Sequence, residues 1–222
     1  MSTEQRLYVW YRTINNTPKG EPLSLETSTV EKYNPKKPMQ DFDFDWSGYI
    51  KGYHSFPPEG ELKLPAQLSL VMKKVKEPKF DYLSTRPTYK IFSKKLYDLL
   101  VKYGLTDKYE YSDLTLLDKQ GNNVGQQEYC LLRFSFSDDD YFDFGEEKVI
   151  GDDIFYPQLR IKTGVNKSLF FVNSLKGFVF SSCMIFTEDV KKEIEELCYE
   201  PEIYPIEEFP DVYIKQMNAW KN

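Results

Sequence analysis

The sequence predicts an α+β fold made mainly of antiparallel strands, with two or three amphipathic helices. Aromatic side chains, which favour strands, make up 16% of the 222 residues and include 17 Tyr and 16 Phe. Short apolar runs alternate with turn-forming segments, and only a few stretches show the spacing of an amphipathic helix. A chain of this length can bury a sizeable core, and a hydrophobic content of 41% excludes a disordered protein.

The first third of the chain is expected to contain short strands separated by ordered loops. Residues 6–14 combine aromatic and β-branched side chains and precede a turn-like segment, so they predict a strand. Seven prolines between Pro18 and Pro65 interrupt longer elements, and a short strand is expected at 46–50. Residues 67–75 fit either a strand or a helix by their pattern alone.

Two segments share the order of a strand, a hydroxyl residue and a helix. In the first, an apolar run at 89–92 ends at Ser93, which is expected to cap a helix that stops near Gly104. In the second, 183–186 ends at Thr187, and acidic residues then suit the positive end of a helix dipole. An ancestral duplication and two independent uses of common capping rules both explain this repeat. The apolar residues expected on the buried helix faces are Leu96, Leu99, Leu100 and Tyr103, and Val190, Ile194, Leu197 and Cys198.

More strands are expected between and beyond the two helices. Residues 114–117 and 129–136 predict an antiparallel pair joined by a polar, glycine-containing loop. The remaining expected elements are strands at 158–162, 169–172 and 178–181, and a weakly patterned helix at 211–220.

The domain organisation predicted from the sequence is simple. The length suits one large domain or two closely packed small ones, and the sequence contains no long flexible linker. We therefore expect a single α+β domain over residues 1–222, in which a subregion at 1–79 packs on a core region at 80–222.

Charge and cysteine content predict a cytoplasmic protein without a nucleic-acid or membrane partner. The 29 basic and 35 acidic residues give a net charge of −6, which disfavours nonspecific binding to phosphate backbones and anionic membranes. The first residues lack the apolar stretch of a signal peptide, and no run approaches the roughly 18 apolar residues of a membrane span. Three cysteines without a CxxC pair are expected to stay reduced. The sequence carries no signal for the oligomeric state.

Side chains on which most enzymes depend are scarce, so we expect no enzyme, no cofactor and no metal centre. His54 is the only histidine and lies in a loop-like segment without a nucleophile motif, and the separated cysteines do not give zinc-ligand spacing. No P-loop or GxGxxG motif occurs. Asp41, Asp43 and Asp45 alternate with phenylalanines, so a strand there would carry either a cation site or a hydrated acidic face. A metal-dependent enzyme with clustered carboxylates is therefore the alternative function.

The segment 138–153 is the candidate partner-binding site. It holds eight acidic residues and one basic residue interleaved with aromatics, and such a cluster repels itself unless a partner or ion neutralises it. One interpretation is a solvated loop that keeps the protein soluble. The other is a docking surface for a basic protein, in which aromatics anchor the partner and carboxylates steer its approach. The candidate residues are Asp138, Asp139, Asp140, Tyr141, Phe142, Asp143, Phe144, Glu146, Glu147, Asp152 and Asp153.

Five motifs cover about half of the chain and lie at 80–83, 89–96, 129–132, 168–171 and 185–190. Together they resemble an immunity-protein family of bacterial polymorphic toxin systems, whose members repeat the pattern of apolar strand, Ser or Thr, and helix. The resemblance implies a small cytoplasmic protein, usually encoded beside a toxin, that protects the producing cell by binding that toxin and blocking its active site or its substrate. It implies no catalytic residue, and the acidic charge balance predicts a basic toxin. A scaffold or interaction protein without a toxin partner is the remaining alternative.

Overall fold

The computed structural model describes residues 5–12, 17–23, 26–39, 63–86, 89–105, 109–134, 138–151, 153–172 and 183–220. Over these residues the chain forms three α-helices and sheets whose strands are mainly antiparallel, which confirms the predicted α+β fold. The strands expected at 46–50 and 178–181 lie outside the described residues.

The chain divides into two compact units. The first unit comprises Met1–Thr17, Lys102–Leu105 and Ser137–Asn222, and the second unit comprises Pro18–Val101 and Thr106–Phe136. Strand β1 (Leu7–Trp10) belongs to the first unit, whereas β2 (Thr27–Val30) and β3 (Gln67–Met72) belong to the second. Residues 1–79 therefore contribute to both units.

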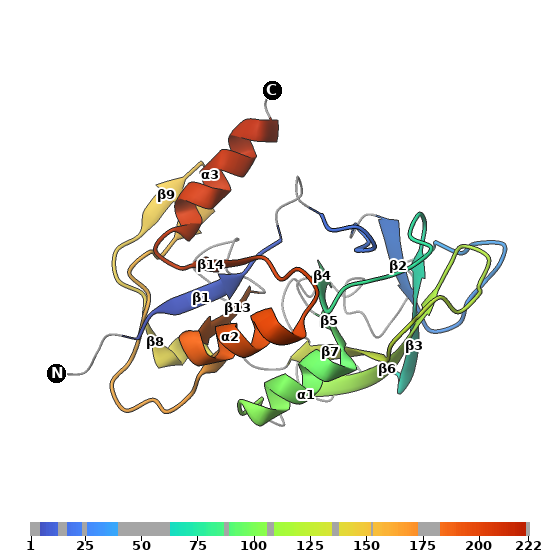
Figure 1. Cartoon of the computed structure of the whole chain (residues 1–222), viewed down its shortest axis with the longest axis horizontal. Coiled ribbons are helices and arrows are strands. Elements are labelled where there is room, and N and C mark those ends of the chain that lie inside the picture. Colours follow the sequence, from blue (N-terminus) through green and yellow to red (C-terminus); the bar gives the residue numbers. More distant parts are fainter. Residues whose placement is uncertain are drawn as a thin grey trace. The chain divides into compact units, whose positions relative to one another are not determined.

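A four-stranded antiparallel sheet forms the centre of the first unit (Figure 1). Its strand order is β12 (Leu169–Val172), β13 (Cys183–Thr187), β1 and β14 (Ile203–Pro205). Helix α2 (Glu188–Leu197) lies on one face, where Nζ of Lys191 stands 5.1 Å from the centre of the Tyr8 ring. Because both faces of the sheet are covered, every residue of β1 and β12 is buried.

The opposite face of this sheet is covered by residues 138–165 and by α3 (Phe209–Trp220). A 3-10 turn, η4 (Asp139–Tyr141), leads into β8 (Phe142–Asp143), which pairs with β11 (Arg160–Ile161). Strand β9 (Lys148–Ile150) pairs with β10 (Asp153–Phe155), and α3 lies beside β9 (Figure 1). The buried cluster consists of Leu7, Val9, Phe142, Phe155, Tyr156, Leu159, Phe170, Val172, Ile185, Ile206 and Phe209.

The second unit is built on a six-stranded sheet. Its order is β2, β3, β6 (Tyr109–Leu117), β7 (Tyr129–Phe134), β5 (Tyr89–Ser93) and β4 (Tyr82–Arg86). The pair of β6 and β7 confirms the expected antiparallel pair, while β3 and β6 run parallel. The ambiguous segment at 67–75 becomes a strand because it is paired on both sides, by β2 and β6.

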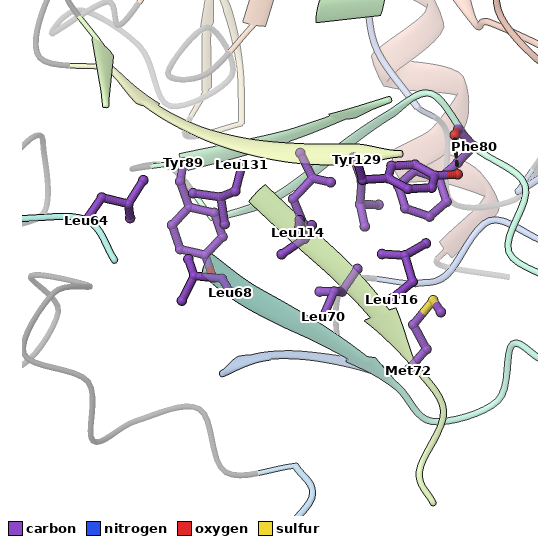
Figure 2. Close-up of a cluster of buried hydrophobic side chains, with 12 residues drawn as sticks. Leu64, Leu68, Leu70, Met72, Phe80, Tyr89, Leu114, Leu116, Tyr129 and Leu131 are labelled. Carbon is purple, nitrogen blue, oxygen red and sulfur yellow. Dashed lines mark hydrogen bonds between the residues drawn. The ribbon is translucent and has the colours of Figure 1, made fainter. Parts of the chain in front are cut away.

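Alternate residues of these strands form the core of the second unit. Leucines of β3 and β6 point into the same space (Figure 2). At its margin the Tyr129 hydroxyl donates a 2.9 Å hydrogen bond to the carbonyl oxygen of Phe80, drawn as a dashed line in Figure 2. On the other face, Tyr97 of α1 (Lys94–Lys102) packs edge-on against Tyr109 and Tyr111. The helix thus covers the face that the leucines leave free.

Both helices that follow a strand begin where the sequence predicts. The Ser93 hydroxyl accepts a 3.4 Å hydrogen bond from the Leu96 N–H, and Gly104 takes the left-handed conformation after the helix, with φ of +86°. Thr187 occupies the residue before α2, but its buried hydroxyl makes no capping hydrogen bond. The third expected helix is confirmed as α3.

Candidate partner-binding site

The acidic segment 138–153 is part of the folded core of the first unit. Its described residues form η4, β8, β9 and the start of β10, and several of their side chains are exposed to solvent. Strand alternation separates its side chains, because successive residues of a strand point to opposite faces. Some candidate residues therefore lie in the core, and others lie on the surface.

Asp138 is a buried structural residue. Its side chain is 2% exposed, and its Oδ1 lies 2.6 Å from Nζ of Lys167. Its Oδ2 accepts a 2.8 Å hydrogen bond from the backbone N–H of Phe171, while its own N–H donates to the Phe171 carbonyl oxygen. Asp138 thus provides hydrogen-bond partners for backbone groups at the outer edge of β12. Its carboxylate is therefore not available to a partner protein.

Phe142 is also a core residue and not a surface anchor. It is 3% exposed and packs edge-on against Phe170, with ring centres 4.7 Å apart. Phe144 is half-buried, and its ring lies 5.0 Å from that of Tyr156. The aromatic rings of this segment thus serve mainly to cover the sheet, which corrects the expectation that Phe142 contacts a partner.

Four acidic residues of the segment are exposed without a cationic partner. Among the described residues, none of the carboxylates of Asp140, Asp143, Glu146 and Glu147 forms a salt bridge. Arg160 lies opposite Asp143 in the pairing of β8 and β11. The negative charge of this stretch is therefore left for solvent, salt or a binding partner to screen.

The hydroxyl of Tyr156 interacts with one of these carboxylates. It donates a 3.2 Å hydrogen bond to Oε1 of Glu147. Burial, assisted by this hydrogen bond, raises the pKa of Tyr156 to about 12. Tyr156 therefore stays protonated well above neutral pH and can keep donating to Glu147.

A second acidic stretch, at residues 188–211, differs from the segment 138–153, because several of its carboxylates form salt bridges. On α2, Lys191 lies 3.1 Å from Glu195 and 3.8 Å from Glu188. A hydrogen bond with Tyr8, followed by the charges of nearby cations, lowers the pKa of Glu188. Asp211 of α3 pairs with Lys148 at 3.1 Å. Several carboxylates of this second stretch are thus paired, in contrast to those of Asp140, Asp143, Glu146 and Glu147.

Two exposed apolar side chains accompany these carboxylates. Tyr141 is 42% exposed, and Val149 of β9 is 63% exposed. Tyr141 is among the candidate residues predicted from the sequence, whereas Val149, which precedes Ile150 in a strongly charged stretch, is not. We name the set Asp140, Tyr141, Asp143, Glu146, Glu147 and Val149 the acidic surface.

The other candidate residues are placed as follows. Asp139 is half-buried in η4, and Asp153 begins β10. Asp152, His54, Asp41, Asp43 and Asp45 lie outside the described residues.

In the part of the chain that the structure describes, no three His, Cys, Asp or Glu side chains are grouped to hold a metal ion. None of the described helices combines the length and the apolar character that a membrane crossing requires.

The whole chain was compared with known proteins. The family model described as Immunity protein 43 matches residues 13–220, which is well over half of the chain. No curated protein matches the chain.

Proposed function

Because the chain belongs to the Immunity protein 43 family, we propose that it neutralises a cognate bacterial toxin by direct noncovalent binding. Family membership assigns an immunity function and, in general terms, a toxin as partner. The proposal adds that the toxin is basic, that binding takes place in the cytoplasm, and that the protein blocks the toxin's active site or substrate without performing chemistry itself.

The observation that carries this proposal is the uncompensated charge of the acidic surface. Asp140, Asp143, Glu146 and Glu147 are exposed and form no salt bridge within the described residues, whereas Glu188 and Glu195 of α2 are paired with Lys191. Unpaired like charges disfavour the free protein slightly and attract an oppositely charged partner over distances near the Debye length, about 8–10 Å at physiological salt. A basic toxin would relieve this repulsion on binding.

The apolar members of the acidic surface suit short-range contact. Tyr141 offers a large rigid ring with a polar tip, a residue type enriched where interfaces bind most strongly. Val149 would lose exposed apolar area against a partner. A standard interface covers about 800 Å² on each partner. The acidic surface would thus form one part of the contact area.

Purified protein and the toxin encoded beside it provide the direct test. We expect a complex that survives gel filtration, loss of toxin activity at stoichiometric ratios, and an association rate constant that falls steeply as salt is raised. If the toxin stays lethal on co-expression and no complex elutes, the proposal is wrong.

A charge-reversal pair tests the acidic surface itself. Asp143→Lys combined with Glu146→Lys is expected to slow association about tenfold or more. Glu195→Lys combined with Glu196→Lys changes the net charge equally on α2 and serves as the control. Equal slowing by both pairs would show that only the total charge matters, and would remove the acidic surface from the proposal.

A further inference from the structure

Charge is distributed unevenly between the two units. The first unit holds 19 of the 35 acidic residues and 12 of the 29 basic ones, which gives it a net charge of −7. The second unit holds the remaining 16 acidic and 17 basic residues, so its net charge is +1. The excess negative charge of the chain therefore belongs to the first unit, and a positive surface is expected on the second.

Exposed lysines gather where β6 of the second unit ends. The Tyr33 hydroxyl joins the two segments that carry them, because it donates a 2.6 Å hydrogen bond to the carbonyl oxygen of Lys119. The half-buried Tyr33 ring packs with Met39 against buried residues of β2, β3 and β6. All four lysines of this group are exposed, and none of them forms a salt bridge within the described residues. We name the set Lys32, Tyr33, Lys36, Lys37 and Lys119 the lysine surface.

The acidic residues beside the lysine surface do not cancel its charge. Glu31 is exposed and forms no salt bridge within the described residues. Asp118 binds groups of its own loop, because its Oδ1 accepts the backbone N–H groups of Gln120 and Asn122 at 2.8 and 2.9 Å. The Asn122 side chain donates to Oδ2, and this hydrogen bond is the main cause that lowers the pKa of Asp118. Four lysines thus outnumber two neighbouring carboxylates.

The acidic surface of the first unit has the opposite excess. Two cations lie next to it, Arg160 opposite Asp143 and Lys162, whose Nζ donates a 2.9 Å hydrogen bond to the carbonyl oxygen of Asp140. The four carboxylates of the acidic surface therefore outnumber two neighbouring cations. Each of the two surfaces also includes one tyrosine. The acidic surface and the lysine surface thus match in the size of their charge excess and differ in its sign.

We propose that the acidic surface of one copy of this chain binds the lysine surface of a second copy. A second copy is favoured over a nucleic acid because the net charge of −6 repels a phosphate backbone. The same net charge repels another copy, but salt screens this repulsion beyond about 8–10 Å, so the opposite charges dominate at contact. Because the two surfaces differ, the contact is head-to-tail, and each assembly keeps one free surface of either kind at its ends. The inference does not depend on the toxin, although the toxin would compete for the acidic surface.

Sedimentation equilibrium of the purified chain provides the first test. In about 50 mM NaCl we expect the weight-average mass to rise steadily above 26.3 kDa as protein concentration increases, and in about 500 mM NaCl to return to that value. Lys36→Gln combined with Lys119→Gln should lower the association constant at least fivefold. Lys63→Gln combined with Lys192→Gln removes the same charge from exposed lysines elsewhere and should lower it less than twofold.

A mixture of two variants tests which surfaces meet. Asp143→Asn combined with Glu146→Gln weakens the acidic surface and should lower self-association as strongly as Lys36→Gln combined with Lys119→Gln. Each of these variants keeps the surface that the other lacks. An equimolar mixture is therefore expected to form a heterodimer with the affinity of the unmodified contact and to grow little beyond it.

Three outcomes would overturn the inference. The first is a mass that stays at 26.3 kDa in low salt. The second is a mixture no heavier than its separate components, and the third is equal weakening by the control variant. If the chain stays monomeric and Lys36→Gln combined with Lys119→Gln instead weakens binding to the toxin, the lysine surface serves the toxin and not a second copy. Failure of the toxin to bind would contradict the proposed function and would leave this result standing.

Discussion

Asp138 and Lys167 form a buried ion pair in which the carboxylate oxygen and the ammonium nitrogen lie 2.6 Å apart. The Asp138 side chain is 2% exposed and that of Lys167 is 15% exposed, so water screens this pair weakly. The second oxygen of the carboxylate accepts the backbone N–H of Phe171 in β12. One side chain thereby joins η4 to an edge strand.

Replacement of Asp138 by alanine is expected to destabilise the first unit strongly. The change leaves the Lys167 ammonium without its carboxylate and the Phe171 N–H without its acceptor, and breaking a buried pair costs about 3 kcal/mol or more. Asp140→Ala, two residues away and exposed, should change the free energy of unfolding by less than about 0.5 kcal/mol. Urea unfolding followed by circular dichroism measures both, and equal effects would contradict this assignment.

The three consecutive aspartates at 138–140 have different environments, which the sequence alone does not reveal. Asp138, Asp139 and Asp140 are identical in type and adjacent in the chain, so composition assigns them one role. Their environments differ, because Asp138 is buried and bonds to Lys167 and Phe171, about thirty residues later, whereas Asp140 is exposed. Such a difference arises from tertiary packing, and no local pattern encodes it. The clustering of exposed charge, in contrast, was visible in the sequence.

Substitutions at the adjacent aromatic residues Tyr141 and Phe142 are expected to have different effects on stability and on toxin binding. Phe142→Ala removes a ring packed against Phe170 in the core and is expected to cost about 3–4 kcal/mol of unfolding free energy. Tyr141→Ala should cost much less, because that side chain is 42% exposed, yet it should weaken toxin binding. Thermal melting and titration calorimetry of both variants measure the two effects. Toxin affinity unaffected by Tyr141→Ala would exclude this ring from the interface.

Alkaline pH is expected to destabilise the second unit through Tyr129. Burial is the main cause that raises the pKa of its hydroxyl to about 12, from an ordinary value of 10.0. The folded state therefore keeps the proton that the unfolded state releases first. Its contribution to stability is complete below about pH 10 and is lost as the pH rises towards 12, by up to about 2 kcal/mol.

The Tyr129→Phe variant tests this pH dependence. It removes the hydroxyl that donates to the Phe80 carbonyl, so it should lower stability at neutral pH by about 1 kcal/mol. It should also flatten the loss of stability above about pH 10. Tyr141→Phe alters an exposed hydroxyl and should keep the full alkaline loss. The midpoint of urea unfolding, measured across this pH range, tests both expectations. If the midpoint of Tyr129→Phe falls with pH as steeply as that of the unmodified protein, the assignment to Tyr129 is refuted.

Local signals predicted single elements of the fold well, and pairing partners poorly. The cap at Ser93 and the stop at Gly104 depend on residues within one helix, so the sequence specifies them. The parallel pairing of β3 with β6, and that of β1 with β13 across most of the chain, depend on which strands meet in three dimensions. Strand β1 pairs with β13 and β14, which lie near the other end of the chain, and no pattern within residues 1–79 indicates these partners.

The thiol of Cys130 is expected to be unreactive in the folded protein. Cys130 lies in β7, is fully buried, and burial raises the pKa of its thiol to about 12. Thiolate is the reactive form, so iodoacetamide at about pH 8 should leave Cys130 unmodified in the native protein and should modify it after unfolding in urea. Mass spectrometry of peptides identifies the labelled residue. Labelling of Cys130 at equal rates in both states would show that β7 opens readily, because alkylation requires the sulfur to reach solvent.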